Sequence, residues 1–273
     1  TTMTLALLRA LHKRGLRIQP FKCGPDYIDP EFHQMACGMR SVNLDSFLQG
    51  PQGMKHAFAR YAGSADAAVI EGVMGLFDGK SPHSIESSSA ECAILLDLPV
   101  ILTVNARGIG GSIAPLVSGF TRWHPSLKIA GVFASQTGSF RHIQILRESL
   151  EKAHLPPLLG ALPRDCRFTL PERHLGLIPT LEHPLSEDLL NLLADELEKH
   201  SRLDDLLQLC RFQEKPFTHP PFSHSDHEDI VCPVLPENIS STSSPRHTSL
   251  RLAVAMDEAF HFYYRENLDM LRD

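Results

Sequence analysis

The sequence lacks any long apolar run and any excess of positive charge. No stretch approaches the roughly 18 consecutive apolar residues that mark a membrane-spanning helix, and none has the pattern of a signal peptide. The formal net charge is −6, which argues against nucleic acid as a partner and, weakly, against an anionic membrane surface. We therefore expect a cytoplasmic protein that binds neither nucleic acid nor membrane.

Paired cysteines and a glycine-rich phosphate loop are also missing. The six cysteines are scattered without a C-x-x-C pair, so they are interpreted as reduced structural thiols. Thr1-Thr2 stands at the start of an apolar helix, where a phosphate loop would supply a Mg²⁺-binding threonine. Because the glycines and lysine of such a loop are absent, Thr1 is better explained as an N-cap. A helix that begins without a preceding strand predicts a missing N-terminus.

What is present is a regular alternation of strands and helices. Helices are predicted from apolar residues at helical spacing, and strands from short, nearly continuous apolar runs such as Pro99 to Val104. The alternation predicts right-handed β-α-β units, and so an α/β fold with a parallel sheet covered by helices on both faces. The predicted helices are 1–11, 52–61, 87–96, 111–123 and 141–153, and the predicted strands are 16–21, 66–70, 99–104, 127–134 and 157–162.

The pattern changes after Pro163. Two more helices are predicted over 185–197 and 203–209, and a segment rich in Pro, His and Ser follows them. A strand over 251–255 and a helix reaching residue 273 come next, and such a pair cannot bury its own apolar faces. We expect a first domain over 1–212, a linker over 213–249 and the start of a second domain over 250–273.

Two carboxylates follow the first strand in a turn stiffened by glycine and proline. Asp26 and Asp29 lie within the turn Gly24–Pro30, just after Lys22, and Tyr27 stands between them. Ligands of open α/β sheets bind at the carboxyl ends of strands, and carboxylate oxygens suit Mg²⁺. The alternative is a surface loop in which the aspartates cap backbone groups.

A second acidic turn, Glu71–Gly79, follows the next buried strand in the same way. A charged residue that closes a buried strand is usually functional or ion-paired, because burial without a partner is costly. The glycines of this turn would let the backbone approach a ligand closely, whereas Asp78 is equally well explained as a turn-forming residue. After the last strand, Arg164 and Arg173 suit a polycarboxylate ligand or an ion-paired rim loop.

These motifs, in this order, resemble the cobyrinic acid a,c-diamide synthases, the glutamine-dependent amidotransferases of corrinoid biosynthesis. The resemblance covers nearly the whole chain, and its most distinctive strings are the two acidic turns. The other matching segments are Thr1-Thr2, Pro20–Lys22, Asn43–Asp45, Leu159–Arg164, Pro171–Leu177, Asp257–Phe260 and Phe262–Tyr264.

The resemblance implies a synthetase domain of the dethiobiotin-synthetase-like P-loop class, followed by the start of a class I glutaminase domain. Glutamine would be hydrolysed in the second domain, and ammonia would pass to the first. There ATP and Mg²⁺ would activate the a- and c-acetate carboxylates of cobyrinic (or hydrogenobyrinic) acid as acyl phosphates, which ammonia would attack. The resemblance leaves self-association into a homo-oligomer open.

Roles for individual residues follow from the same resemblance. Asp26 and Glu71 would organise Mg²⁺ and the phosphates, with Thr1 at the Mg²⁺ position of the phosphate loop. Asp29 and Asp78 would position the substrate carboxylate and its intermediate. The remaining expected contacts are with nucleotide or phosphate for Thr2, Lys22 and Ser135, and with substrate for Tyr27, Arg164 and Arg173.

Departures from the family pattern keep one alternative open. Besides the absent phosphate loop, Ser135-Gln136 stands where the family usually has an Asn-Arg pair near the nucleotide base. The alternative is a non-catalytic or degenerate protein of the P-loop class that lacks nucleotide turnover. Cobyric acid synthase and dethiobiotin synthetase are the nearest enzyme rivals, but the Gly24–Pro30 turn and the glutaminase-like start at Arg251 argue against both.

Overall fold

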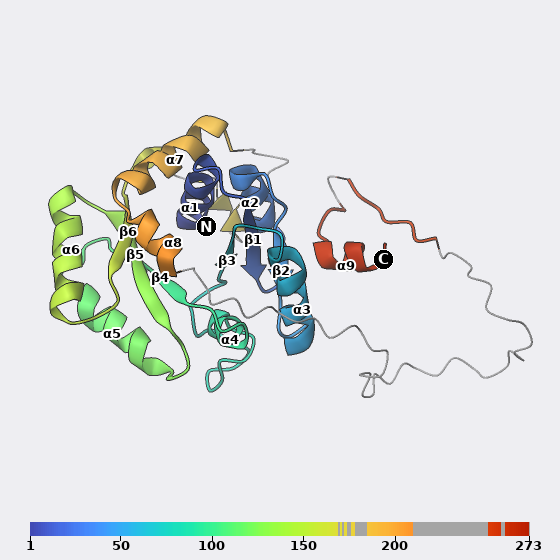
Figure 1. The fold of residues 1–273 in the computed structure, drawn as a ribbon, viewed down its shortest axis with the longest axis horizontal. Coiled ribbons are helices and arrows are strands. Elements are labelled where there is room, and N and C mark those ends of the chain that lie inside the picture. The colour runs from blue at the N-terminus through green and yellow to red at the C-terminus, as the bar shows by residue number, and fades with distance from the viewer. Residues whose placement is uncertain are drawn as a thin grey trace, which may run out of the picture. The chain divides into compact units, whose positions relative to one another are not determined.

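The computed structural model describes residues 1–168, 170, 172–173, 176–177, 185–209, 251–257 and 260–272. The chain divides into two compact units, one formed by Thr1–Lys215 with Phe262–Asp273 and the other by Pro216–His261. Every helix and strand of the described residues belongs to the first unit, which Figure 1 shows as a layered α/β structure. The predicted linker, 213–249, lies outside the described residues.

The six longer strands form two parallel three-stranded sheets, which confirms the predicted α/β class. In the first sheet β1 lies between β2 and β3, and in the second β5 lies between β4 and β6. A short antiparallel pair, β7 with β8, follows. The strands are β1 (Ile18–Cys23), β2 (Val42–Leu44), β3 (Ala67–Glu71), β4 (Val100–Asn105), β5 (Ile129–Thr137), β6 (Leu158–Pro163), β7 (Glu172–Arg173) and β8 (Gly176–Leu177).

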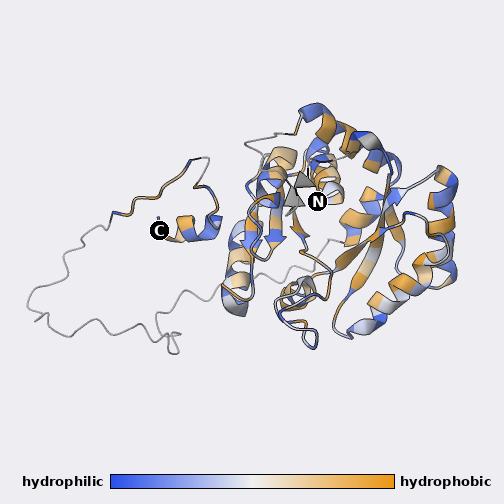
Figure 2. Ribbon diagram, turned by 180° about the vertical axis from the view of Figure 1, so that it is seen from behind, coloured by the Kyte–Doolittle hydropathy of each residue, from blue (hydrophilic) through white to orange (hydrophobic). Residues whose placement is uncertain are grey.

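Helices cover both faces of these sheets because successive strand residues point to opposite sides. In β5, Val132 and Ala134 pack in the core beneath α5 and α6, whereas Phe133 packs in the core with α1, α7 and α8. Figure 2 shows the strands as mostly hydrophobic and the helices as two-sided. The helices are α1 (Thr2–Lys13), α2 (Asp29–Cys37), α3 (Gly50–Ala62), α4 (Ser89–Leu95), α5 (Ile113–Trp123), α6 (Phe140–Lys152), α7 (Glu187–Lys199), α8 (Leu203–Leu209) and α9 (Arg265–Met270), with a 3₁₀ turn at Cys166–Phe168.

Helix α1 joins the cores of the two sheets. Its residues Met3 and Ala6 pack with Phe133 of β5, while Leu5 and Leu8 pack with Ile18 of β1. Residues on two sides of one helix are therefore buried, which explains why this helix is so apolar. The packing fixes the start of α1 against the carboxyl end of β1, where the acidic turn begins.

Three local predictions differ from the structure. Helix α2 and strand β2 were not predicted, since Asp29–Cys37 has no clear apolar periodicity and Val42–Leu44 is only three residues long. The strand predicted over 251–255 is wrong, because the described residues 251–257 form no ladder. A strand is completed by hydrogen bonds to a neighbouring strand, and an apolar run alone does not supply one.

Substitution of a core leucine in α6 tests this packing. Leu146 is fully buried and the adjacent Ile145 is 41% exposed. Leu146→Ala is expected to lower the free energy of unfolding by about 2–5 kcal/mol, since it leaves a cavity. Ile145→Ala is the matched control and should change it much less. Urea denaturation followed by circular dichroism measures both, and equal losses would contradict the assigned core.

Candidate functional site

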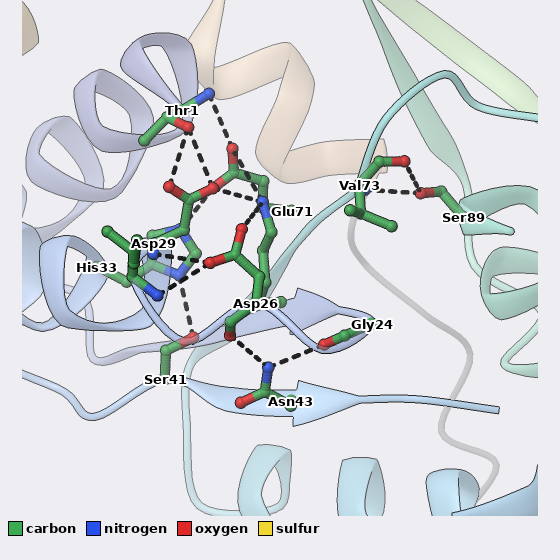
Figure 3. A network of polar contacts seen from close by, with 12 residues as sticks. Thr1, Gly24, Asp26, Asp29, His33, Ser41, Asn43, Glu71, Val73 and Ser89 are labelled. Atoms are coloured by element: carbon green, nitrogen blue, oxygen red, sulfur yellow. Dashed lines mark hydrogen bonds and ion pairs between the residues drawn. The ribbon is translucent and has the colours of Figure 1, made fainter. Parts of the chain in front are cut away.

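A buried lysine at the end of β1 gathers three carboxylates. The ammonium Nζ of Lys22 lies 2.5 Å from Oδ2 of Asp29, 3.3 Å from Oδ2 of Asp26 and 3.8 Å from Oε1 of Glu71. The parallel register places Lys22 beside Glu71 on β3 and beside Asn43 on β2. Three neighbouring strand ends therefore meet at one point, as Figure 3 shows.

The turn that carries Asp26 and Asp29 is held by its own hydrogen bonds. Oδ1 of Asp26 accepts from the backbone N–H groups of Ile28 (3.0 Å) and Asp29 (3.1 Å) at the start of α2. From β2, the Asn43 amide donates to the carbonyls of Gly24 (2.9 Å) and Asp26 (2.7 Å). Gly24 has a φ of +71°, a conformation that glycine adopts without strain. The capping role considered for the aspartates is thus present at Asp26, together with the ion pair to the lysine.

A histidine absent from the sequence-based assignments completes the cluster. His33 is fully buried on α2, and its Nε2 lies 2.5 Å from Oε2 of Glu71 while Nδ1 lies 3.0 Å from the hydroxyl of Ser41. A carboxylate only accepts, so Nε2 carries the proton that faces Glu71. The available signal was spacing, because Asp29 and His33 are four residues apart and share one face of a helix.

Thr1 lies on the other side of the same carboxylates. Its hydroxyl donates to Asp29, at 3.1 and 3.2 Å from the two carboxylate oxygens, and its backbone nitrogen lies 2.8 Å from Oε1 of Glu71. Thr1 occupies the N-cap position of α1 without a side-chain cap bond. The simpler expectation of an N-capping hydroxyl is therefore wrong, and the hydroxyl faces the acidic cluster.

The three charges shift one another's pKa values in different directions. Burial would raise the pKa of Glu71, but the hydrogen bond from His33 and the charge of Lys22 hold it well below its usual range. Burial and the charge of Glu71 raise the pKa of Asp29. Burial would lower the pKa of Lys22, but Glu71 and Asp29 raise it. Glu71 and Lys22 are thus charged at neutral pH, and the pKa values of Glu71 and Asp29 are shifted in opposite directions.

The second acidic turn folds onto itself and onto α4. Asp78 is exposed and accepts from the backbone N–H of Gly75 at 2.8 Å, as a turn-forming residue does. Ser89 accepts from the Val73 N–H at 2.9 Å (Figure 3), and a Cβ at Gly72 would lie 2.8 Å from the Ser89 hydroxyl oxygen. The close approach that requires glycine here is made by protein atoms of this chain.

The remaining expected contact residues lie on several elements of the first unit. Ser135 lies near the end of β5 in the other sheet, and its hydroxyl donates to the Val104 carbonyl at 3.4 Å. Arg164 is exposed just after β6, and Arg173 pairs through its backbone within β7 and β8. Tyr27 stacks on Phe262 and Tyr264, with ring centroids 5.4 and 5.2 Å away. Thr2 is the first residue of α1 and is half-buried.

Within the described residues, no three His, Cys, Asp or Glu side chains are arranged to hold a metal ion by themselves. The lysine ammonium takes the central position among the three carboxylates. Mg²⁺ usually needs only one or two protein carboxylates, together with phosphate oxygens and water. Asp26, Glu71 and Thr1 supply oxygen atoms of the kind that Mg²⁺ binds.

Comparison with known protein families assigns the chain to one of them. Residues 1–178 match the model of the CobQ/CobB/MinD/ParA nucleotide binding domain, CbiA. The chain belongs to this family. The nucleotide-binding domain therefore includes the whole acidic cluster, both strand-end turns and all six strands of the two parallel sheets.

Relatives within this family are similar along nearly the whole chain. Cobyrinate a,c-diamide synthases of Listeria monocytogenes, Syntrophotalea carbinolica and Salmonella typhimurium are 42%, 41% and 40% identical to it over 100%, 100% and 99% of its length. The chain spans only 56%, 55% and 55% of those proteins. A solved structure, chloroplast FtsY from Physcomitrella patens, aligns with 60% of this chain and 55% of its own at 11% identity with a TM-score of 0.43, which is too low to add to the assignment.

Removing the central charge tests the cluster. Lys22→Met leaves two buried carboxylates, Asp29 and Glu71, and the half-buried Asp26 without their cation. It should lower the free energy of unfolding by about 3–5 kcal/mol at pH 7. The pKa of Asp29, already raised by burial and by Glu71, then rises further, so the folded state binds a proton at Asp29 more readily than the unfolded state does. The variant should therefore regain stability as the pH falls from 7 toward the ordinary carboxyl pKa.

The matched control is Lys128→Met, which breaks an exposed pair with Asp97. Such surface pairs contribute little, so the denaturant midpoint should hardly move. Urea titrations between pH 5 and 8 measure both variants. A Lys22→Met protein that loses stability on acidification over this range would contradict the assigned charge crowding.

Proposed function

We propose that this chain is the ATP-dependent part of a cobyrinate a,c-diamide synthase, a ligase that converts the a- and c-side-chain carboxylates of cobyrinic or hydrogenobyrinic acid into amides. The similarity to such synthases over 99–100% of the chain supports this proposal. The observation that carries it is the lysine-centred carboxylate cluster at the strand ends, because that edge of a parallel sheet is where nucleotide and substrate meet.

The chemistry requires that a carboxylate be made reactive. A carboxylate is a poor electrophile, and its phosphorylation by ATP would give an acyl phosphate that ammonia attacks, with phosphate as the leaving group. Bound Mg²⁺ would neutralise the phosphate oxygens during this transfer. In this chain Asp26, Glu71 and Thr1 would hold the metal, and Lys22 would offset the negative charge that accumulates.

Opposite pKa shifts fit a division of labour between the acids. Glu71 stays ionised because of His33 and Lys22, which suits a metal ligand. Burial and the charge of Glu71 raise the pKa of Asp29, so Asp29 suits a metal ligand less well than Glu71 does. Its carboxylate lies against the Lys22 ammonium and accepts from the Thr1 hydroxyl, two groups that would also bind a substrate carboxylate. We therefore assign substrate positioning to Asp29, with His33 as a positioning residue for Glu71.

Assignments away from the cluster belong to the same proposal. Asp78 would reach the substrate intermediate if the second acidic turn moves when ligands bind, and Ser135 and Thr2 would contact the nucleotide. Arg164, Arg173 and Tyr27 would contact the corrinoid's carboxylates or face. Glutamine would supply ammonia through a glutaminase part that begins near residue 250, after a synthetase part over 1–212.

The proposal places the reaction in the cytoplasm. Among the described residues, no helix is long and apolar enough to cross a membrane, and the net charge is −6. Both observations are compatible with an enzyme that acts on freely diffusing anionic substrates.

A direct assay tests the function. The full-length protein that contains this chain is incubated with ATP, Mg²⁺, cobyrinic acid and either glutamine or ammonium, and product mass is followed. Two successive conversions of carboxylate to amide are expected. Asp26→Asn and Glu71→Gln should each slow amide formation about a hundredfold or more, since each removes a charge that acts on the reacting phosphate.

Glu151→Gln, on the exposed face of α6, is the matched control and should leave the rate unchanged. Nucleotide binding without amide formation on any corrinoid acid would instead favour the alternative, a non-catalytic protein of the P-loop class. Wild-type rates in Asp26→Asn and Glu71→Gln would refute the assigned site while leaving the reaction in place.

A further inference from the structure

The segment Phe262–Arg272 docks onto the edge formed by β2 and α3, more than 200 residues earlier in the chain. The hydroxyl of Tyr264 donates to Oδ2 of Asp45 at 3.1 Å, and the hydroxyl of Tyr61 donates to Oδ2 of Asp269 at 2.7 Å. The amide of Gln49 donates to the carboxylate of Glu266. Three side-chain hydrogen bonds therefore join this segment to the first part of the chain.

Two side chains of the docked segment are buried, as in a specific contact and unlike a loose surface association. Tyr264 is 6% exposed and Glu266 is 5% exposed. Burial raises the pKa of Glu266 and that of Tyr264. Polar groups taken out of water at this cost need specific partners, and Asp45 and Gln49 supply them. Asp45, Gln49 and Tyr61 thus form the surface on which the segment docks, named here the β2–α3 surface.

Two sets of contacts connect this surface with the acidic turn Gly24–Pro30. The first is direct, because Tyr27 stacks on Phe262 and Tyr264 and is the residue next to Asp26. The second runs through β2, since Asn43 fixes the Gly24 and Asp26 carbonyls from a position two residues before Asp45.

Asp45 has a role of its own in the chain before α3. Its Oδ1 accepts from the backbone N–H groups of Phe47 (2.9 Å) and Leu48 (3.1 Å), while Oδ2 accepts from Tyr264. One carboxylate therefore fixes the turn after β2 and receives the docked segment at the same time.

We propose that the β2–α3 surface is the docking site through which the ammonia-donating part of the protein is held against the acidic turn, with Phe262–Arg272 as its docking segment and Tyr264 as its central positioning residue. The inference rests on the proposed glutamine-dependent function. The acidic turn has supports of its own in Lys22 and Asn43. Loss of docking should therefore impair the use of glutamine while leaving the use of free ammonium intact.

The test measures both nitrogen donors in the full-length protein. Tyr264→Phe keeps the ring that stacks on Tyr27 but removes the hydrogen bond to Asp45, and Tyr61→Phe removes the bond to Asp269. Each should lower glutamine-dependent amide formation about tenfold, as loss of a hydrogen bond to a charged group does. Ammonium-dependent amide formation should stay unchanged. Met270→Ala, at an exposed position of α9, is the matched control and should affect neither rate.

Two results would overturn the proposal. Equal loss with both donors would show that the segment only supports the fold, and unchanged rates with both donors would show that docking is not needed. Absence of amide formation by the wild-type protein with either donor is a different result, because it refutes the proposed function itself.

A second measurement judges the docking independently of the reaction. Hydrogen exchange of the full-length protein should be about tenfold faster in Tyr264→Phe over residues 264–272 and 45–48, and unchanged in α6. Unchanged exchange over residues 264–272 would refute the docking whether or not amides are formed.

Discussion

The buried ammonium group of Lys22 is the interaction on which the candidate site depends. Three carboxylates that converge at neighbouring strand ends would repel one another, and a cation at the centre offsets that repulsion. The lysine is placed by β1, because its neighbours in register are Glu71 and Asn43. The parallel register of the three strands therefore also sets the charge balance of the site. A shift of register would separate Lys22 from its carboxylates.

The rest of the first unit holds that arrangement in place. Helix α1 packs against the cores of both sheets and brings Thr1 to the carboxylates. Helix α2 begins at Asp29 and carries His33 to Glu71. From the far end of the described chain, Tyr264 reaches Asp45 beside the same turn. Several elements therefore hold the acidic side chains in fixed positions, close to one another despite their like charge.

Long periodic elements were predictable from the sequence, and short ones were not. The strands around Phe133 and Leu102 are continuous apolar runs, so their positions and parallel pairing followed from pattern alone. Helix α2 and β2 are short and carry polar residues that serve the site, namely Asp29, His33 and Asn43. Their apolar pattern is therefore weak. For the same reason, His33 and Asn43 were not assigned to the candidate site from the sequence, while the acidic turns around Asp26 and Glu71 were found.

The sequence by itself determined the α/β class, the two acidic strand-end turns and the family, since these depend on local apolar pattern and on short motifs. Only the tertiary structure decided which acids meet. It joined Asp26, Asp29 and Glu71 through Lys22 and left Asp78 in a turn of its own. It also turned the Thr1 hydroxyl toward Asp29 and brought Tyr264 to Asp45. The physical reason is that strand register and helix packing set distances between residues far apart in the chain, and no local pattern records those distances.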